Sequence, residues 1–570
     1  MPELPEESAL SELSELSYAS GTGAEPLTGD TIGARLRRTA SRLPHSPALV
    51  DVAAGRRWTY EEFARDVDLL ALGLLGKGVQ RGERVGIWAP NCADWVLVQF
   101  AAARIGAVLV SVNPAFSVGE LRDVLQRSET EILFASRDWE EQVERVWEEC
   151  PALRDVFLVE PGENAGWSEP MDLGLQMTMT YPERLEERAA ELSCDDPVSL
   201  QYTSGTTGSP KGATLSHHNI LNNALAIGTL LGYDENDRIC LPVPLFHTFG
   251  MVMGTLAAVA TGACSVLPAP SFDAGAVLRA VRDEGCTSLY GVPTMFIAEL
   301  SALDAGTTDV RPRELTSLRT GIMAGAPCPV EVMKRVMSEM GMAGVAICYG
   351  MTETSPVSLM TRADDDLERR TATVGTVMPH LEVKVTDPAT GLTVARGERG
   401  ELCVRGYSVM LGYWEDPEQT AAAIDAARWM HTGDLAEMGD DGYVRIVGRT
   451  KDMIIRGGEN VSPREVEELL HTHPKISDVQ VVGVPHERLG EEVAACVILA
   501  PGADSLTLDE IAAHCEGRLA RYKIPRHLHV LDGFPLTTSG KVRKVELRAT
   551  LAATLSTRHD VPQPGTQEER

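Results

Sequence analysis

One stretch of the chain combines glycines, hydroxyl side chains and a lysine in the way that a polyphosphate site requires. It extends from Tyr202 to Gly212, and the largely apolar segment 198–200 predicts a strand that leads into it. Glycines let a backbone approach a ligand closely, and N–H groups, hydroxyls and an ammonium group are donors that phosphate oxygens accept. The spacing differs from the common G-x-x-x-x-G-K-[ST] loop, because Pro210 occupies the place of the second glycine. We predict a phosphate site, rather than a flexible linker, formed by Thr203, Ser204, Gly205, Thr206, Thr207, Gly208, Ser209, Pro210 and Lys211.

A second polar stretch supplies a candidate ligand for a divalent cation. Its sequence is Tyr349-Gly350-Met351-Thr352-Glu353-Thr354. A carboxylate beside a polyphosphate is stable only when a divalent cation lies between them. Taken alone, these six residues are more typical of a helix cap, so their meaning depends on the phosphate loop.

These stretches resemble the signatures of the acyl-adenylate-forming enzymes, and most of all those of the medium- and long-chain fatty acyl-CoA synthetases. The resemblance covers about residues 30–550. In that family the glutamate helps to hold Mg²⁺ on the nucleotide, and the neighbouring threonine contacts phosphate. The resemblance therefore assigns Glu353 and Thr206 to the metal, Thr352 to the phosphate, and Tyr349, Gly350 and Met351 to the nucleotide.

Two shorter motifs complete the nucleotide site that the resemblance implies. Gly325, Ala326 and Pro327 resemble the adenine loop, where small residues let a flat base lie against the backbone. Asp434, in Thr432-Gly433-Asp434, resembles the aspartate that accepts hydrogen bonds from both ribose hydroxyls, and Arg449 would reinforce it.

The C-terminal part carries residues that the resemblance assigns to the catalytic cycle. Lys541 would bridge the substrate carboxylate and the α-phosphate, a task that suits a compact charge on a long stem. Lys451 matches the hinge about which the small domain swings between two poses. Gly457, Gly458 and Glu459 resemble the segment that guides the thiol of CoA, and a tight hairpin turn is compatible with that role.

The segment Pro244–Gly250 resembles the family's acyl site, and this resemblance indicates which acid would be bound. His247 stands where amino-acid-activating relatives carry an aspartate for the substrate amine, so an amino-acid substrate is disfavoured. His247 is a candidate catalytic residue, with a core or capping role as the alternative. An apolar, deformable channel suits an alkyl chain, and an aryl acid stays open as the substrate. By analogy, the segments that line the channel contain Met251, Met253, Met295 and Met323.

The elements that must position these residues alternate between strands and helices. Residues 84–89, 107–112 and 131–135 have the apolar character of buried strands, and helices are predicted at 93–105, 118–128 and 139–149. This alternation predicts an α/β fold with parallel sheets. The uncharged run 250–267 predicts a buried helix that continues into a buried strand, rather than a membrane span.

The 570 residues are too many for one hydrophobic core. We predict a disordered lead-in at 1–28 and a large N-terminal body at 29–450, with several subdomains and mixed or parallel sheets, that binds AMP and the acyl group. A small mobile α+β domain follows at 451–556, with capping boxes at Ser462 and Thr507, and a flexible tail at 557–570 ends the chain.

The overall composition limits the kinds of molecule that the protein is expected to bind. The net charge of −30 disfavours nucleic acid and anionic membranes. The eleven cysteines include no C-x-x-C pair and predict reduced thiols in the cytoplasm. The acidic, Ser-rich start predicts no secretory signal.

The motifs together predict an acyl-CoA synthetase. It would use ATP and Mg²⁺ to adenylate a medium- to long-chain fatty acid, and then transfer the acyl group to coenzyme A with release of AMP and pyrophosphate. The alternatives are an aryl-acid CoA ligase, a ligase that loads a carrier protein, and a nucleotide-binding protein that has lost catalysis. The predicted partners are a carboxylic acid and CoA, and a homodimer stays open.

Overall fold

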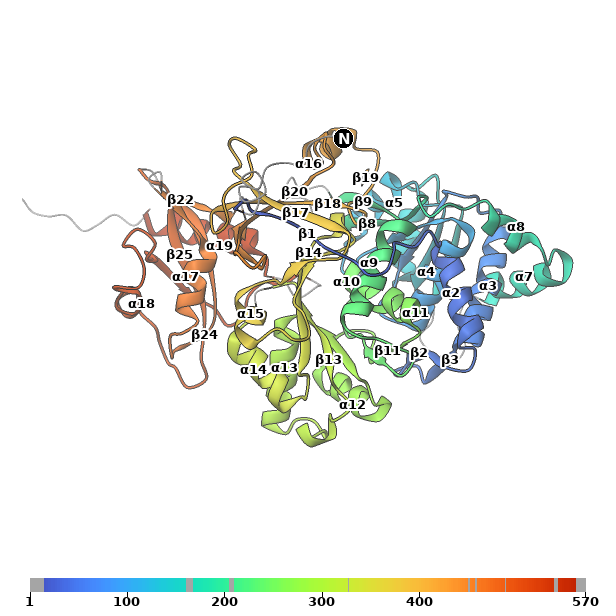
Figure 1. Cartoon of the computed structure of the whole chain (residues 1–570), viewed down its shortest axis with the longest axis horizontal. Helices are drawn as coiled ribbons and strands as arrows, with labels where there is room; N and C mark the ends of the chain where they lie inside the picture. The colour runs from blue at the N-terminus through green and yellow to red at the C-terminus, as the bar shows by residue number, and fades with distance from the viewer. Residues whose placement is uncertain are drawn as a thin grey trace, which may run out of the picture.

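The chain folds as three sheets with their helices, followed by a fourth sheet in the C-terminal part (Figure 1). The structure is a computed structural model that describes residues 15–159, 168–203, 210–326, 328–449, 452–456, 459–486, 488–537 and 542–559. The first three sheets carry the predicted nucleotide residues. The C-terminal sheet and its helices lie at one end of the molecule, coloured orange to red in Figure 1.

A seven-stranded sheet, in the order β19-β9-β8-β5-β4-β6-β7, carries the phosphate loop. Strands β8, β5, β4, β6 and β7 are parallel, and β9 is antiparallel to β8. The predicted strands and helices between residues 84 and 149 are confirmed, with ends shifted by one or two residues. The strands are β4 (Arg84–Trp88), β5 (Val108–Ser111), β6 (Ile132–Ser136), β7 (Asp155–Val159), β8 (Pro197–Thr203), β9 (Lys211–Ser216) and β19 (Gly412–Tyr413). The helices are α3 (Tyr60–Gly76), α4 (Ala93–Ile105), α5 (Val118–Arg127), α6 (Glu140–Trp147), α7 (Ser168–Thr180) and α8 (Arg184–Ala190).

A nine-stranded sheet, in the order β16-β15-β14-β13-β12-β10-β11-β2-β3, carries the predicted adenine and metal residues. Its centre is parallel, and β15 and β16 add antiparallel strands at one edge. The strands are β2 (Pro47–Asp51), β3 (Arg56–Thr59), β10 (Arg238–Cys240), β11 (Cys264–Leu267), β12 (Ser288–Gly291), β13 (Thr320–Ala324), β14 (Gly344–Gly350), β15 (Val357–Met360) and β16 (Thr376–Val377). The helices are α2 (Ile32–Arg42), α9 (His217–Leu230), α12 (Ala274–Glu284), α13 (Pro293–Ala305), α14 (Val330–Glu339) and α15 (Leu367–Ala372).

The uncharged run at 250–267 forms the predicted buried helix and strand. The helix begins as α10 (Thr248–Gly250), passes through a π-helical segment (Met251–Leu256) and ends as α11 (Ala257–Thr261), before β11. Every residue from Thr248 to Ala260 is buried. None of the helices in the described part of the chain combines the length and apolar character that a bilayer crossing requires.

The third sheet is antiparallel, with the strand order β1-β17-β18-β20-β21. Its first strand lies in the segment that was predicted to be disordered. The prediction of a disordered lead-in at 1–28 is wrong for residues 18–20, which pair with β17, and Ser17 is fully buried. Residues 1–14 lie outside the described part. The elements are β1 (Tyr18–Ser20), β17 (Leu381–Thr386), β18 (Arg399–Gly406), α16 (Pro417–Ala423), β20 (Met430–Met438) and β21 (Val444–Arg449).

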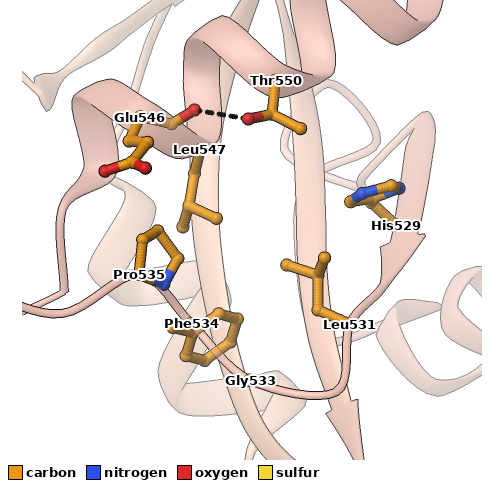
Figure 2. A pocket seen from close by; sticks show the side chains of 8 residues that line it. All are labelled: His529, Leu531, Gly533, Phe534, Pro535, Glu546, Leu547 and Thr550. Carbon is orange, nitrogen blue, oxygen red and sulfur yellow. Dashed lines mark hydrogen bonds between the residues drawn. The ribbon is translucent and has the colours of Figure 1, made fainter.

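The C-terminal part has the α+β character that the sequence predicts. Its sheet has the order β23-β22-β25-β24, and β26 pairs with β25. A cavity of about 460 Å³ lies between the end of β26 and the last helix, beside Leu531, Phe534 and Leu547 (Figure 2). The elements are β22 (Ile454–Arg456), β23 (Glu459–Val461), α17 (Pro463–Leu470), β24 (Ile476–His486), β25 (Gly490–Leu499), α18 (Leu508–Cys515), β26 (His527–Val530) and α19 (Lys544–His559).

Three local predictions in this part have different outcomes. The capping box at Thr507 is formed, because Glu510 and Thr507 exchange hydrogen bonds at the start of α18. The one at Ser462 is wrong: the Ser462 hydroxyl donates to the carbonyl of Val447 on β21 and leaves α17 without a side-chain cap. The predicted tail at 557–570 begins too early, because α19 continues to His559.

Candidate active site

The predicted phosphate loop closes the hairpin between β8 and β9. The last paired residues of the two strands are Thr203 and Lys211, so the loop joins the strand ends. Pro210 is half-buried at the end of the loop, and Ser204–Ser209 lie outside the described residues. Lys211 donates from Nζ to Oε1 of Gln419 at 2.6 Å, and its ammonium group lies 5.0 Å from the ring centroid of Tyr413. These two contacts hold the lysine beside a polar cavity of about 280 Å³.

Glu353 lies in the turn after β14 and faces the same tyrosine. Its side chain is 7% exposed, and Oε1 accepts a hydrogen bond from the Tyr413 hydroxyl at 2.8 Å. Burial and the Glu353 carboxylate raise the pKa of Tyr413 well above its usual value, so the hydroxyl stays a donor. Tyr413 therefore connects the lysine of the phosphate loop to the predicted metal ligand. Thr352 is buried in the same turn.

The end of β14 also reaches the predicted ribose residue. The Tyr349 hydroxyl donates to Oδ2 of Asp434 on β20 at 2.5 Å. Gly350 leaves no room for a side chain, because a Cβ there would lie 1.7 Å from the carbonyl oxygen of Pro356. Met351 follows, half-buried, and its backbone N–H donates to that carbonyl.

The predicted adenine residues lie at the neighbouring strand end. Strand β13 is parallel to β14, so Gly325 and Ala326 leave the sheet at the edge where Tyr349 lies. Gly325 has a φ of +92°, a backbone conformation that favours glycine. Carboxyl ends of parallel strands are where α/β sheets bind ligands. Pro327 lies outside the described residues.

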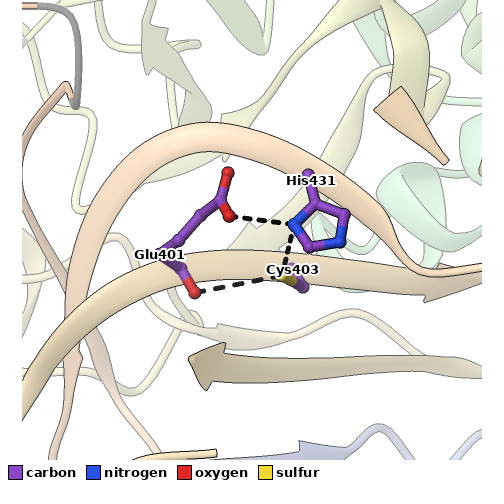
Figure 3. Close-up of side chains that lie close together, drawn as sticks. All are labelled: Glu401, Cys403 and His431. Carbon is purple, nitrogen blue, oxygen red and sulfur yellow. Dashed lines mark hydrogen bonds and ion pairs between the residues drawn. The ribbon is translucent and has the colours of Figure 1, made fainter. Parts of the chain in front are cut away.

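Asp434 lies on β20 where the pairing of β20 with β18 shifts register, a bulge at residues 432–434. Gly433 before it has a φ of +71°, and the Asp434 N–H donates to the Thr432 hydroxyl. The Gly433 N–H donates to Oε1 of Glu401 at 3.1 Å. Glu401 lies beside Cys403 and His431 on the two neighbouring strands (Figure 3), and burial raises the pKa of the Cys403 thiol to about 11. Arg449 is paired with Asp434 in the register of β20 and β21.

His247 has the capping role that the sequence left as the alternative. Its Nδ1 accepts a hydrogen bond from the Phe249 N–H at 3.2 Å, which starts α10. This bond makes Nδ1 an acceptor, so a neutral imidazole carries its proton on Nε2. The observed geometry therefore gives His247 a positioning role for the helix that carries Met251 and Met253.

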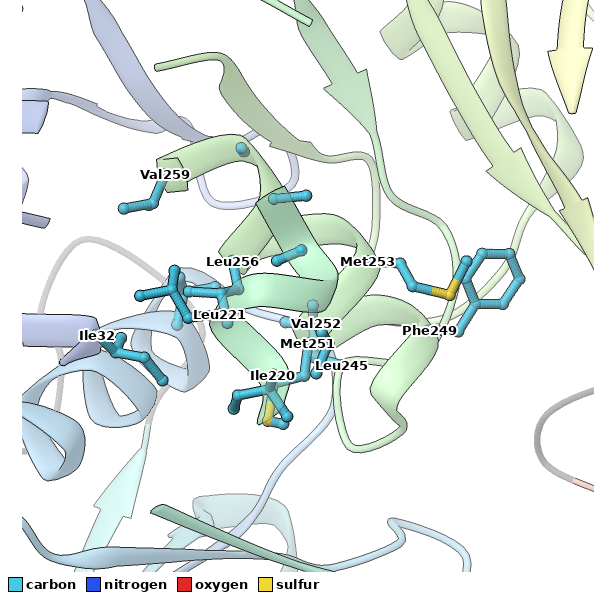
Figure 4. Close-up of a cluster of buried hydrophobic side chains, with 14 of the residues drawn as sticks. Ile32, Ile220, Leu221, Leu245, Phe249, Met251, Val252, Met253, Leu256 and Val259 are labelled. Carbon is cyan, nitrogen blue, oxygen red and sulfur yellow. The ribbon is translucent and has the colours of Figure 1, made fainter. Parts of the chain in front are cut away.

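The apolar side chains near the predicted acyl channel divide between two faces of the nine-stranded sheet. Met251, Met253 and Met295 belong to one buried cluster, and Figure 4 shows Met253 beside Phe249. Met323 is packed in a different cluster, where its sulfur contacts Cys328. Successive residues of a strand point to opposite faces, and Met323 lies on the face of the sheet opposite to the other three methionines.

The C-terminal predictions fall mostly outside the described residues. Lys451, Gly457, Gly458 and Lys541 are not described. Glu459 begins β23 and pairs with Arg456 at the end of β22. Leu536 and Val542 form an antiparallel bridge, which brings the two ends of the segment that contains Lys541 together.

Sequence reasoning missed Tyr413, Gln419 and Glu401, which hold the predicted residues in place. Tyr413 and Gln419 come from a segment that leaves the third sheet after β18, adds β19 to the seven-stranded sheet and returns as β20. The pair Gly412-Tyr413 in a two-residue strand was a weak signal. Only the tertiary arrangement shows what these side chains contact.

Known proteins of one family match almost the whole chain. The family described as AMP-binding enzyme matches residues 36–414, and its C-terminal domain matches residues 465–541. The chain belongs to the AMP-binding enzyme family. The predicted family and α/β fold class are thereby confirmed.

Proteins that are similar in sequence and structure indicate the type of reaction that this AMP-binding enzyme catalyses. The medium-chain acyl-CoA ligase ACSF2 of Danio rerio is 43% identical over 93% of this chain and 90% of its own. The putative acyl-CoA synthetase YngI of Bacillus subtilis (strain 168) is 44% identical over 92% of this chain and 97% of its own. The ATP-bound crystal structure of MatB from Rhodopseudomonas palustris is similar, with a TM-score of 0.81 and 28% identity over 92% of this chain and all of that one. The prediction of an ATP-dependent acid–CoA ligase is confirmed.

Proposed function

We propose that this AMP-binding enzyme adenylates a medium- to long-chain fatty acid with Mg²⁺ and ATP, and then transfers the acyl group to CoA. The observation that carries the residue roles is Tyr413, which contacts the ammonium group of Lys211 with its ring and the carboxylate of Glu353 with its hydroxyl. A cation and a carboxylate that contact the same rigid side chain suit the binding of a polyphosphate together with its metal ion.

The roles of the nucleotide residues follow from their chemistry. Glu353 and Thr206 would hold Mg²⁺, which prefers oxygen ligands and would neutralise phosphate charge there. The fit of Glu353 is supported by its burial and by the tyrosine that holds one carboxylate oxygen. Lys211 and the loop donors would bind phosphate, and Asp434 would accept the ribose hydroxyls.

The acid is proposed to lie against Met251, Met253 and Met295. These side chains are buried, and methionine adapts its shape to an alkyl chain. The relative from Danio rerio is named a medium-chain ligase, which supports the same substrate class. The eleven free cysteines support work in a reducing compartment such as the cytoplasm.

The proposal is tested first by separating the two half-reactions. Lys541→Ala should lose adenylation, measured by acid-dependent pyrophosphate exchange, by roughly two to three orders of magnitude, because the charge that joins carboxylate and phosphate is gone. It should largely retain CoA thioester formation from supplied acyl-AMP. Lys475→Ala is the matched control, because it removes a lysine of the same domain that pairs with Glu510 at the surface. Equal loss of both half-reactions in Lys541→Ala would contradict the assigned role.

A panel of acids tests the substrate class. Pyrophosphate release from ATP should be greatest with acids of medium to long alkyl chain, and weak with acetate and benzoate. A maximum with benzoates would favour an aryl-acid ligase. Acid-dependent release without any CoA thioester would favour loading of a carrier protein. No release with any acid would leave only a nucleotide-binding role.

A further inference from the structure

The bulge of β20 that carries Asp434 lacks regular pairing with β18. In the register of β18 and β20, Glu401 is paired with Leu435 and Cys403 with His431. Three residues of β20 therefore lie opposite the single residue Leu402. Such irregularities re-aim side chains and leave backbone groups without ladder partners. Asp434 is paired with Arg449 of β21 on one side, so on the β18 side other hydrogen bonds must hold this part of β20.

Side chains supply those bonds. The Thr432 hydroxyl donates to the Leu402 carbonyl at 2.7 Å and accepts from the Asp434 N–H at 3.1 Å. Oε1 of Glu401 accepts from the Gly433 N–H at 3.1 Å. A hydrogen bond from an N–H to a carboxylate is stronger than one to a neutral acceptor.

The carboxylate of Glu401 is itself fixed in place. Its Oε2 lies 2.9 Å from Nδ1 of His431, and that nitrogen lies 3.6 Å from the sulfur of Cys403 (Figure 3). The Glu401 side chain is 15% exposed. One carboxylate oxygen thus holds the bulge at Gly433, while the other is anchored by His431 on the same strand.

We propose that Glu401 is a positioning residue for the nucleotide: through the Gly433 N–H it holds Asp434 where the ribose hydroxyls bind, with His431 fixing its carboxylate. This inference rests on the proposed role of Asp434 but adds a residue that contacts no substrate. A change of Glu401 should therefore alter the affinity for the nucleotide without altering the binding of the acid.

The test measures AMP affinity by calorimetry, because AMP binds the ribose site without the metal of ATP. Glu401→Ala should raise the Kd for AMP about tenfold, and the KM for ATP in parallel, while the KM for the acid stays unchanged. Glu401→Gln should keep most of the affinity, because its amide oxygen accepts from Gly433 and its amide N–H reaches a His431 tautomer with a bare Nδ1. Glu437→Ala is the matched control, because Glu437 lies on β20 and pairs with Arg399 of β18 instead.

A double variant decides whether Glu401 acts through Asp434. Asp434→Asn should weaken AMP binding more than Glu401→Ala, and combining the two changes should cause no further loss, because coupled residues are not additive. Additive losses, or an unchanged Kd in Glu401→Ala, would overturn the inference. Wild-type affinity in Asp434→Asn would instead overturn the proposed ribose site.

The same cluster presents a competing explanation that the experiment also addresses. Ligand atoms of Glu401, Cys403 and His431 lie within 4.8 Å of one another, a spacing that a thiophilic divalent cation would fit. If a chelator weakened AMP binding to the wild-type protein as much as Glu401→Ala does, an ion would hold the bulge and the inference would be wrong. Unchanged AMP affinity in the chelator supports the hydrogen-bonded brace.

Discussion

Replacing Tyr413 by phenylalanine tests the link between the phosphate loop and the metal carboxylate. The change removes one oxygen atom and keeps the ring that faces Lys211. The lost hydroxyl is a 2.8 Å donor to a carboxylate that is 7% exposed. Hydrogen bonds to buried charged groups contribute about 1.5–3 kcal/mol. The Tyr413 hydroxyl is expected to position Glu353 for the metal ion in the transition state of adenylation. Loss of this energy in the transition state then corresponds to a roughly 10- to 100-fold slower adenylation.

The assay compares the two half-reactions in Tyr413→Phe. Pyrophosphate exchange should fall by that factor, and thioester formation from supplied acyl-AMP should be unchanged, because no metal-bound triphosphate takes part in it. Tyr407→Phe is the control, because it removes a buried hydroxyl that contacts Asn223 and should leave both rates near the wild-type values. Equal slowing of both half-reactions would show that Tyr413 acts only through stability, and an unchanged exchange rate would refute its role.

Two further predictions concern the fold around the site. Gly350→Ala should prevent stable folding or abolish ATP binding, because its Cβ would meet a backbone oxygen at 1.7 Å. Gly119→Ala, with only the end of Arg122 within 4.0 Å, should lower neither Tm nor activity, because alanine is favoured over glycine in helix α5. His217 is fully buried and accepts the Ile32 N–H at Nδ1, and burial lowers its pKa to about 4. Because the unfolded chain binds the proton with a pKa near 6.5, the stabilisation is present above that pH and is lost as pH falls toward 4. Urea unfolding should show that the wild type loses roughly 2.5 kcal/mol more than His217→Gln between pH 7 and 4.5. Equal losses in both proteins would contradict this account.

The fold around the phosphate loop follows closely from local sequence. The helix at Ala93–Ile105 has the predicted bounds, because Gly106 ends it in a left-handed conformation. Strand β8 contains the apolar residues from which a strand was predicted before the loop. Local pattern is sufficient where an element's own residues decide its ends.

The remaining errors have tertiary causes. Ser462 has the sequence of a helix cap, but a carbonyl of β21 lies within reach and takes its hydroxyl. Residues 18–20 are too few to show a pattern, and they form a strand only because β17 offers an unpaired edge. The contacts of Tyr413 and Glu401 depend on segments that are far apart in the sequence, so the sequence alone did not predict their roles.

The segment with Tyr413 and Gln419 has a consequence for how the protein acquires its activity. Gln419 contacts Lys211 across 208 positions of the chain, and Tyr413 contacts Glu353 across 60. Contacts so distant in sequence form late, because the chain between them must first be ordered. A partly folded chain with complete sheets would therefore lack the assembled phosphate site. During refolding, nucleotide affinity should appear only after the three sheets have docked, later than the recovery of secondary structure.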